Sequence, residues 1–111
     1  TLKSLVRRGP ADATMALALI HHLCISNNLP LEHVVEFFRA YTRNHLIIEF
    51  VPKSDSQVKR LLSTREDIFV DYVQENFERE FKVVFDIIKA VKISNTERTI
   101  YLMKKRGGEH E

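Results

Sequence analysis

The sequence predicts an α/β fold in which a parallel β-α-β unit is followed by two helices and a terminal antiparallel hairpin. Three observations lead to this prediction. An apolar run at residues 13–20 has the length of a buried strand. An amphipathic pattern at 31–41 predicts a helix between that run and a second apolar run at 45–51. The β-branched stretches 83–93 and 98–104 are close enough in sequence to pair as a hairpin.

The first strand, residues 13–20, is expected to be buried on both faces because residues 15–20 are apolar without a polar break. His21 and His22 end the run. The following turn formers predict a loop over residues 21–30, in which Pro30 suits the first turn of the next helix. If the strand is parallel, both histidines lie at the edge of the sheet where ligands bind in open α/β folds.

The helix at 31–41 is predicted from apolar residues that recur at spacings of three and four, with residues 42–44 closing it. The second strand, 45–51, ends at Pro52, which has no N–H to donate to a ladder. Two parallel strands joined by a helix of this length form one right-handed β-α-β unit. The apolar stripe of the helix consists of Leu31, Val34, Val35, Phe38 and Tyr41.

The second half of the chain predicts two helices and the hairpin. Ser54, Asp55 and Ser56 offer N-caps for a helix that ends near residue 62. A longer helix is expected over 67–81, with Thr64 and Asp67 as a loose capping pair. Residues 107–111 are expected to be a disordered tail.

Composition limits the class of protein. With 111 residues, 44% hydrophobic and 29% charged, the chain is one globular domain and not a disordered segment. The formal charge is +2, and the basic clusters at Arg7-Arg8 and 104–106 are too sparse to predict a nucleic-acid partner. The single cysteine, Cys24, excludes an intrachain disulfide and favours a cytoplasmic location. No apolar stretch approaches the roughly 20 residues that span a membrane.

Five stretches, in order and over nearly the whole chain, point to a known family: PADATMALALIHHL, NNLPL, LIIEFVPKSDSQVKRLL, REDIF and RTIYLMKKR. Together they resemble a bacterial branch of the class I S-adenosylmethionine-dependent methyltransferases. The resemblance implies a partial domain over residues 1–111, the C-terminal half of a Rossmann-like sheet that comprises the family's fourth to seventh strands. It also implies that the strand at 13–20 is the fourth, the one at 45–51 the fifth, and the hairpin the sixth and seventh.

The resemblance also implies what the chain lacks. In this family a glycine-rich loop in the first half of the domain holds S-adenosylmethionine. The three glycines here, Gly9, Gly107 and Gly108, form no glycine-rich loop between a predicted strand and a helix. The chain also starts at Thr1, within what reads as a short helix over residues 1–8. We therefore expect a fragment, or a domain completed by another chain, that binds little S-adenosylmethionine and is inactive alone.

The candidate catalytic residues are His21 and His22, which the resemblance aligns with the residues after the family's fourth strand. A neutral imidazole can accept a proton from a substrate N–H or O–H. The alternative is that one histidine packs under the loop and bonds to the backbone. A metal site is not expected, because no third ligand stands at a useful spacing.

Four further residues are candidates for binding the methyl acceptor. Glu49 interrupts an apolar strand, and a buried acid needs a partner, for which Lys53 and Arg60, after the turn, are the candidates. Glu49 and Lys53 either border the cleft or form a structural ion pair. Asn27 and Asn28 either shape a loop over the acceptor or serve only as turn formers.

If the chain is a fragment, the strand at 13–20 is expected to need a partner. Without the family's first three strands, residues 13–20 form an exposed apolar edge, which soluble proteins avoid. We expect this edge to pair with the missing N-terminal half or with a second copy in a homodimer. Two functions remain open: the acceptor side of a methyltransferase cleft, or a non-catalytic interaction module derived from that fold. The sequence does not identify the acceptor.

Overall fold

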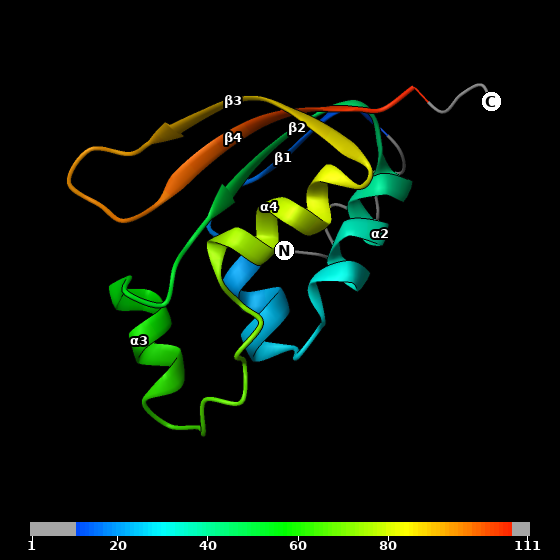
Figure 1. Ribbon diagram of the computed structural model, residues 1–111. Helices are drawn as coiled ribbons and strands as arrows, with labels where there is room; N and C mark the ends of the chain where they lie inside the picture. Colours follow the sequence, from blue (N-terminus) through cyan, green and yellow to red (C-terminus); the bar gives the residue numbers. More distant parts are fainter. Residues whose placement is uncertain (1–10, 108–111) are drawn as a thin grey trace.

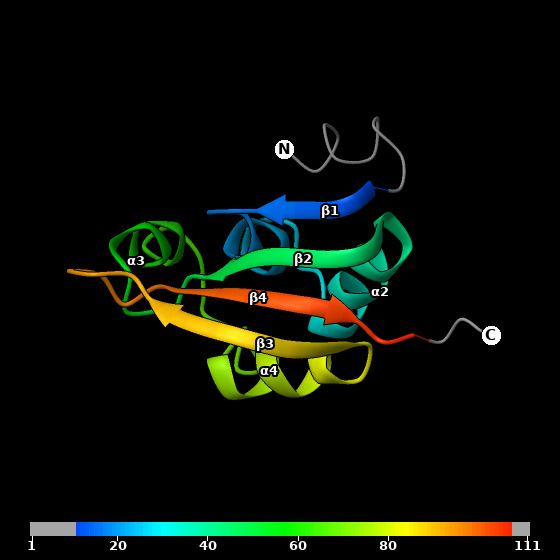
Figure 2. The same cartoon turned by 90° about the horizontal axis from the view of Figure 1, so that it is seen from above.

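The structure, a computed structural model, describes residues 11–107 and confirms the predicted α/β class. Its sheet has four strands: β1 (Ala11–Ala16), β2 (Thr42–Phe50), β3 (Phe85–Lys92) and β4 (Thr99–Lys105). The strand order is β1-β2-β4-β3. β1 is parallel to β2, and β4 is antiparallel to both of its neighbours (Figure 2). The parallel β-α-β unit and the terminal antiparallel hairpin are therefore both present. The helix predicted at 1–8 and residues 108–111 of the predicted tail lie outside the described residues.

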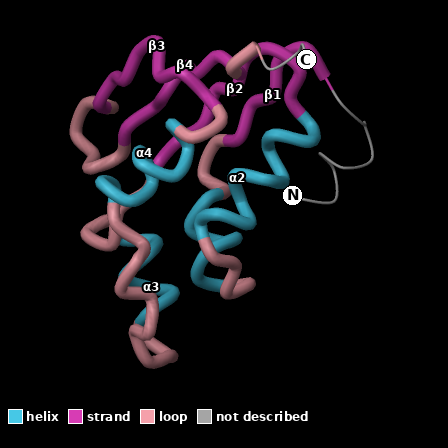
Figure 3. Tube along the Cα trace, turned by 45° about the vertical axis from the view of Figure 1, so that its right-hand side comes forward, coloured by secondary structure: helices cyan, strands magenta, loops and turns pink. Residues whose placement is uncertain are grey.

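The described helical segments all lie on one side of the sheet (Figures 1 and 3). They are a π-helical turn, η1 (His22–Ser26), and three α-helices, α2 (Leu31–Tyr41), α3 (Ser56–Leu62) and α4 (Gln74–Lys82). No helix in the described part of the chain is long and apolar enough to cross a membrane. No described helix covers the other side of the sheet, where the side chain of Met15 is 58% exposed.

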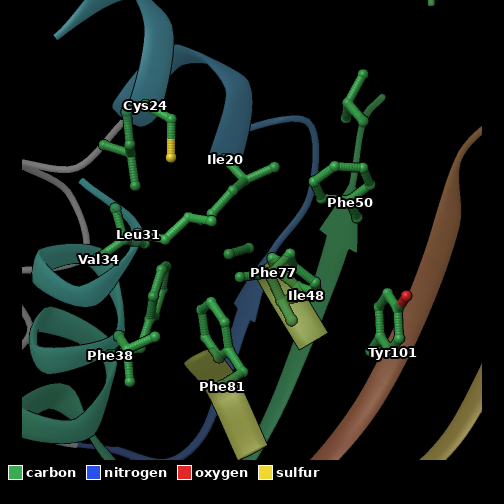
Figure 4. Packing of buried hydrophobic residues seen from close by; sticks show 14 of the residues in the cluster. Ile20, Cys24, Leu31, Val34, Phe38, Ile48, Phe50, Phe77, Phe81 and Tyr101 are labelled. Atoms are coloured by element: carbon green, nitrogen blue, oxygen red, sulfur yellow. The ribbon is translucent and has the colours of Figure 1, made fainter. Parts of the chain in front are cut away.

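The core lies between the sheet and helices α2 and α4, and aromatic rings dominate it (Figure 4). Phe77 is at its centre, with ring centroids 4.7 Å from Phe81, 5.0 Å from Phe50 and 5.1 Å from Tyr101. All four side chains are at most 1% exposed. Offset and tilted ring pairs at these separations add to the free energy gained by burying apolar area.

The first strand is shorter than predicted. β1 ends at Ala16, and Ala18 has a left-handed φ of 53° that no strand accommodates. The chain then turns so that Ile20 and Leu23 are buried beneath the sheet, and the predicted loop is helical over residues 22–26. An uninterrupted apolar run does not distinguish a strand from a buried turn and helix, which is why the prediction failed here.

The expectation that this strand is buried on both faces is also wrong. Thr14 and Ala16 are buried, whereas Met15 between them is exposed. The register places Met15 beside Ile47 of β2, which in turn pairs with Leu102 of β4. These three apolar side chains share the face that no described helix covers.

β2 begins earlier than predicted. Residues 42–44, predicted to close the helix, begin β2, and the buried Thr42 hydroxyl donates to Thr14 of β1.

α4 begins later than predicted. It starts at Gln74 and not at residue 67, because residues 67–73 form an irregular segment. Asp67 does not cap a helix with Thr64, since its carboxylate accepts from the Lys53 ammonium. α3 begins after Asp55, which accepts from the N–H of Gln57 as a predicted N-cap.

Candidate functional site

The candidate site lies beyond the carboxyl ends of the parallel strands β1 and β2. The turn after β1, the end of β2, the start of α3 and the start of β4 meet there, at the end of the sheet where α3 lies (Figure 2). Loops at this edge place side chains from different strands around one crevice, and ligands of open α/β sheets bind in it.

Glu49 links the two parallel strands at this edge. Its carboxylate, in a residue 5% exposed, accepts a 2.6 Å hydrogen bond from the N–H of Ala18 and lies 3.7 Å from the guanidinium of Arg98. The hydrogen bond holds the turn after β1 in its left-handed conformation. Glu49 is therefore a residue that positions the turn.

The predicted ion pair between Glu49 and Lys53 or Arg60 is wrong. The Lys53 ammonium instead lies 3.0 Å from the Asp67 carboxylate and donates to the carbonyl of Phe69. Antiparallel pairing places Ile100 of β4 opposite Glu49, so the residues just before β4 reach this end of β2. The predicted hairpin was the signal from which Arg98 could have been found.

Arg98 also forms the strongest ion pair of the site. Its Nε and Nη2 atoms donate to the two Asp55 carboxylate oxygens at 2.8 and 3.2 Å, and both side chains are less than one fifth exposed. Hydrogen bonding from Arg98 lowers the pKa of Asp55 and raises that of Arg98. Because Asp55 also caps α3, this bidentate pair fixes the start of that helix to β4.

The two histidines stand directly after this turn and differ in their surroundings. Their ring centroids are 4.2 Å apart, His21 is fully buried and His22 is partly exposed. Neither ring nitrogen of His21 has a hydrogen-bond partner of ordinary geometry among the described residues. Burial, followed by the charge of His22, lowers the pKa of His21 to about 4. His21 is therefore neutral near pH 7, and His22 is the more accessible of the pair.

Asn27 and Asn28 follow η1 and have different positions. The N–H of Asn27 donates to the carbonyl of His22, whereas Asn28 adopts a left-handed φ of 54°. Asn28 lines a hollow of about 200 Å³ that it shares with Phe69. Lys53 binds the carbonyl of Phe69, so Lys53 fixes one wall of the hollow and Asn28 belongs to the other.

Cys24 lines the same hollow but is not a candidate nucleophile. It is 4% exposed, and burial raises the pKa of its thiol to about 12. The thiolate is the reactive form, so at neutral pH this side chain behaves as a small apolar group. In the described part of the chain, no group of three or more potential ligands is arranged to hold a metal ion.

A second hollow of about 490 Å³ opens beside the ion-pair network. Glu49, Asp55 and Arg98 line it together with the loop that joins β3 to β4. The structure therefore brings Glu49 close to the turn that precedes the histidines. Asn28 lines the other hollow, whereas Lys53 only contacts its wall through the carbonyl of Phe69, and Asn27 precedes Asn28 without lining the hollow.

Comparison with known proteins gives two similarities. Nodulation protein NoeA of Rhizobium meliloti (strain 1021) is 41% identical over 98 residues, which are 88% of this chain and 20% of that protein. The chain therefore spans about one fifth of the length of this relative. No family model matches the sequence.

The second similarity is structural. The crystal structure of magnesium protoporphyrin IX methyltransferase (ChlM) from Synechocystis PCC 6803 with bound SAH superposes with a TM-score of 0.56 at 15% identity. The match covers 88% of this chain and 46% of that one. At this identity the similarity concerns the fold, which is that of part of a methyltransferase domain. The predicted resemblance is confirmed at this level.

Proposed function

We propose that this chain, whose fold is that of the C-terminal half of a class I S-adenosylmethionine-dependent methyltransferase, forms the acceptor side of a methyltransferase cleft. The observation behind the proposal is the network at the carboxyl ends of β1 and β2. There Glu49 holds a left-handed turn that delivers His21 and His22 to the ligand-binding edge of the sheet.

Within this proposal the two histidines have separate roles. His22, the more accessible ring, accepts a proton from the N–H or O–H group of the acceptor. The ring of His21 lies beside it, tilted, with the two ring centroids 4.2 Å apart. Because His21 is neutral, it places no full positive charge beside His22. Glu49, Asp55 and Arg98 are positioning residues, because they bond to one another and to the turn.

The small hollow between the loop after η1 and residues 67–73 is proposed to receive part of the acceptor. Its wall is mostly apolar, and Asn28 supplies an amide at its edge. Lys53 contributes by holding the carbonyl of Phe69. Asn27 belongs to the same loop through its bond to His22.

We do not expect the described residues to hold S-adenosylmethionine by themselves. Gly107 is the one glycine among them, and it follows the last strand, far along the chain from the turn after β1. The cofactor is proposed to bind mainly to a completing N-terminal half, which pairs along the free edge of β1. Among the described strands, β1 pairs only with β2.

The decisive experiment is calorimetry with S-adenosylmethionine on the protein that includes the sequence upstream of Thr1 and on the 111-residue chain. The proposal predicts saturable binding to the longer protein and at least about tenfold weaker binding to the chain, a difference of about 1.4 kcal/mol. Equal binding to both, or no binding to the longer protein, would contradict it.

The second candidate is a non-catalytic interaction module, which the open β1 edge and the exposed Met15 favour. Light scattering after size exclusion, applied to the longer protein and to the 111-residue chain, distinguishes the two proposed functions. If both form the same homodimer through β1, the module is the better account. If only the short chain self-associates, the edge is normally covered by the completing half.

A further inference from the structure

The opposite end of the sheet carries a basic hollow that the proposed function does not use. We name as the basic end the five cations that line it: Arg39, Arg43, Lys104, Lys105 and Arg106. They come from the last turn of α2, the start of β2 and the end of β4. Figure 2 shows the tip of β4 between the starts of β2 and β3, away from α3 and the candidate site. The hollow measures about 710 Å³.

The positive charge of the basic end is only partly neutralised. Three of its cations each contact one acid: Arg39 with Glu36 at 2.8 Å, Arg106 with Asp86 at 3.0 Å, and Arg43 with Asp12 at 3.8 Å. None of these acids lines the hollow. All three pairs are largely exposed, so the acids screen the cations weakly.

The other two cations have no acidic partner among the described residues. Lys104 is exposed and forms no side-chain hydrogen bond or ion pair there. The Lys105 ammonium donates to the carbonyls of Arg39 and Thr42, at 2.7 and 3.1 Å, and so caps the end of α2. These bonds hold a full positive charge at the wall of the hollow.

From this geometry we propose that the basic end binds a small molecule with two or three linked phosphate groups. Like charges gathered from three segments repel one another, and a polyanion that bridges them removes this cost. Charge-assisted hydrogen bonds from guanidinium and ammonium groups to phosphate oxygens are short and strong. A volume of about 710 Å³ exceeds what one phosphate needs and falls within the range of small-molecule pockets.

The arrangement favours a compact polyphosphate over a nucleic acid. The five cations surround one hollow, whereas a nucleic acid is recognised by a stripe or a face of positive charge. The remaining basic residues are spread over the chain, whose formal charge is only +2.

The test is isothermal titration calorimetry of the 111-residue chain with tripolyphosphate. The wild type is compared with the double variant Arg43→Gln/Lys104→Gln and with Lys59→Gln/Lys89→Gln. The control variant removes the same charge from exposed positions that do not line the hollow. We expect saturable binding, about tenfold weaker in the first double variant because two phosphate contacts are lost, and changed less than about twofold in the control.

Three results would overturn the proposal. They are no saturable binding of tripolyphosphate to the wild type, an equal loss in both double variants, and binding of a single-stranded oligonucleotide that tripolyphosphate does not displace. Circular dichroism verifies that each variant is folded. The single variant Lys104→Gln, at an exposed side chain without partners among the described residues, keeps the test valid if Arg43 proves necessary for folding.

Discussion

At the scale of single residues, Glu49 determines the geometry of the candidate site. Its carboxylate accepts the N–H of Ala18 and faces Arg98. Replacing Glu49 by alanine leaves a poorly solvated N–H and part of a guanidinium without a partner. We expect Glu49→Ala to lower the free energy of unfolding by about 2 to 3 kcal/mol, measured by urea denaturation.

Glu49→Gln separates the hydrogen bond from the charge. The amide oxygen still accepts from the N–H of Ala18, and Arg98 keeps its bidentate pair with Asp55. The free energy of unfolding should therefore fall by about 1 kcal/mol or less. Glu97→Ala is the matched control, because this exposed acid of the hairpin pairs only at the surface with Lys92, at 3.6 Å. Equal losses in Glu49→Ala and Glu97→Ala would show that the network has no structural role.

His21 should make the chain sensitive to mild acid. Its pKa is about 4 in the fold and has the ordinary value of 6.5 in the unfolded chain, so the unfolded state takes up the proton more readily. Stability from this group is complete above about pH 7 and falls as the pH drops from about 6.5 towards 4. At pH 5 the expected loss is about 2 kcal/mol.

Several neighbouring groups raise or lower the pKa of His21. Burial, the charge of His22 and the charge of Arg98 lower its pKa, whereas Asp55 and Gln57 raise it. Hydrogen bonding from Arg98 lowers the pKa of Asp55, so this carboxylate keeps its charge to lower pH than an ordinary aspartate. Urea denaturation at pH 8 and pH 5 tests the prediction. The variant His21→Leu should reduce the difference between the free energies of unfolding at pH 8 and pH 5. The control variant His33→Gln, on the exposed side of α2, should leave this difference unchanged.

At the scale of elements, the left-handed turn at Ala18 is what ends β1. A non-glycine residue in this conformation costs about 1 to 2 kcal/mol, whereas glycine costs about 0.5 to 1 kcal/mol in chain entropy. Ala18→Gly should therefore raise the free energy of unfolding by about 0.5 to 1 kcal/mol. In Ala16→Gly, within the strand, the same exchange should lower it. Thermal unfolding of both variants tests the prediction, and a loss of stability in Ala18→Gly would contradict it.

The elements show how much the sequence can predict. α2 has the predicted bounds of 31–41, because its apolar stripe and Pro30 define both face and start. The predicted antiparallel pairing of the two hairpin strands is confirmed. The boundary at Ala16 could not be predicted, since the turn depends on a hydrogen bond from Ala18 to Glu49, a residue on another strand. The start of α4 depends in the same way on tertiary contacts, among them the bond from Tyr72 to the carbonyl of Val51.

The edge at which the candidate residues lie could be predicted from the sequence, whereas their contacts could not. Glu49 and the turn that leads to His21 and His22 lie at the same carboxyl edge, because parallel strands bring their carboxyl ends to one edge of a sheet. Arg98 was missed because its role arises only when β4 pairs with β2. Sequence distance favoured Lys53 as the partner of Glu49, and the turn at Pro52 directs that lysine to Asp67 instead.

At the scale of the whole molecule, the described helices cover one face of the sheet, and none of them covers the other, open face (Figure 1). Met15, Ile47 and Leu102 form a row across the open face. Exposed apolar faces of this kind mark surfaces that a further element covers. The open face and the free edge of β1 meet at Met15, so one completing half would contact both.

We expect the turn after β1 and the end of β2 to form the wall of a ligand cleft. The most direct test is hydrogen-deuterium exchange on the protein that extends upstream of Thr1, with and without S-adenosylhomocysteine. Slower exchange is expected in peptides covering residues 17–23 and 49–55, and no change at residues 103–106 at the basic end. No protection in the first two peptides, or protection confined to the third, would contradict it.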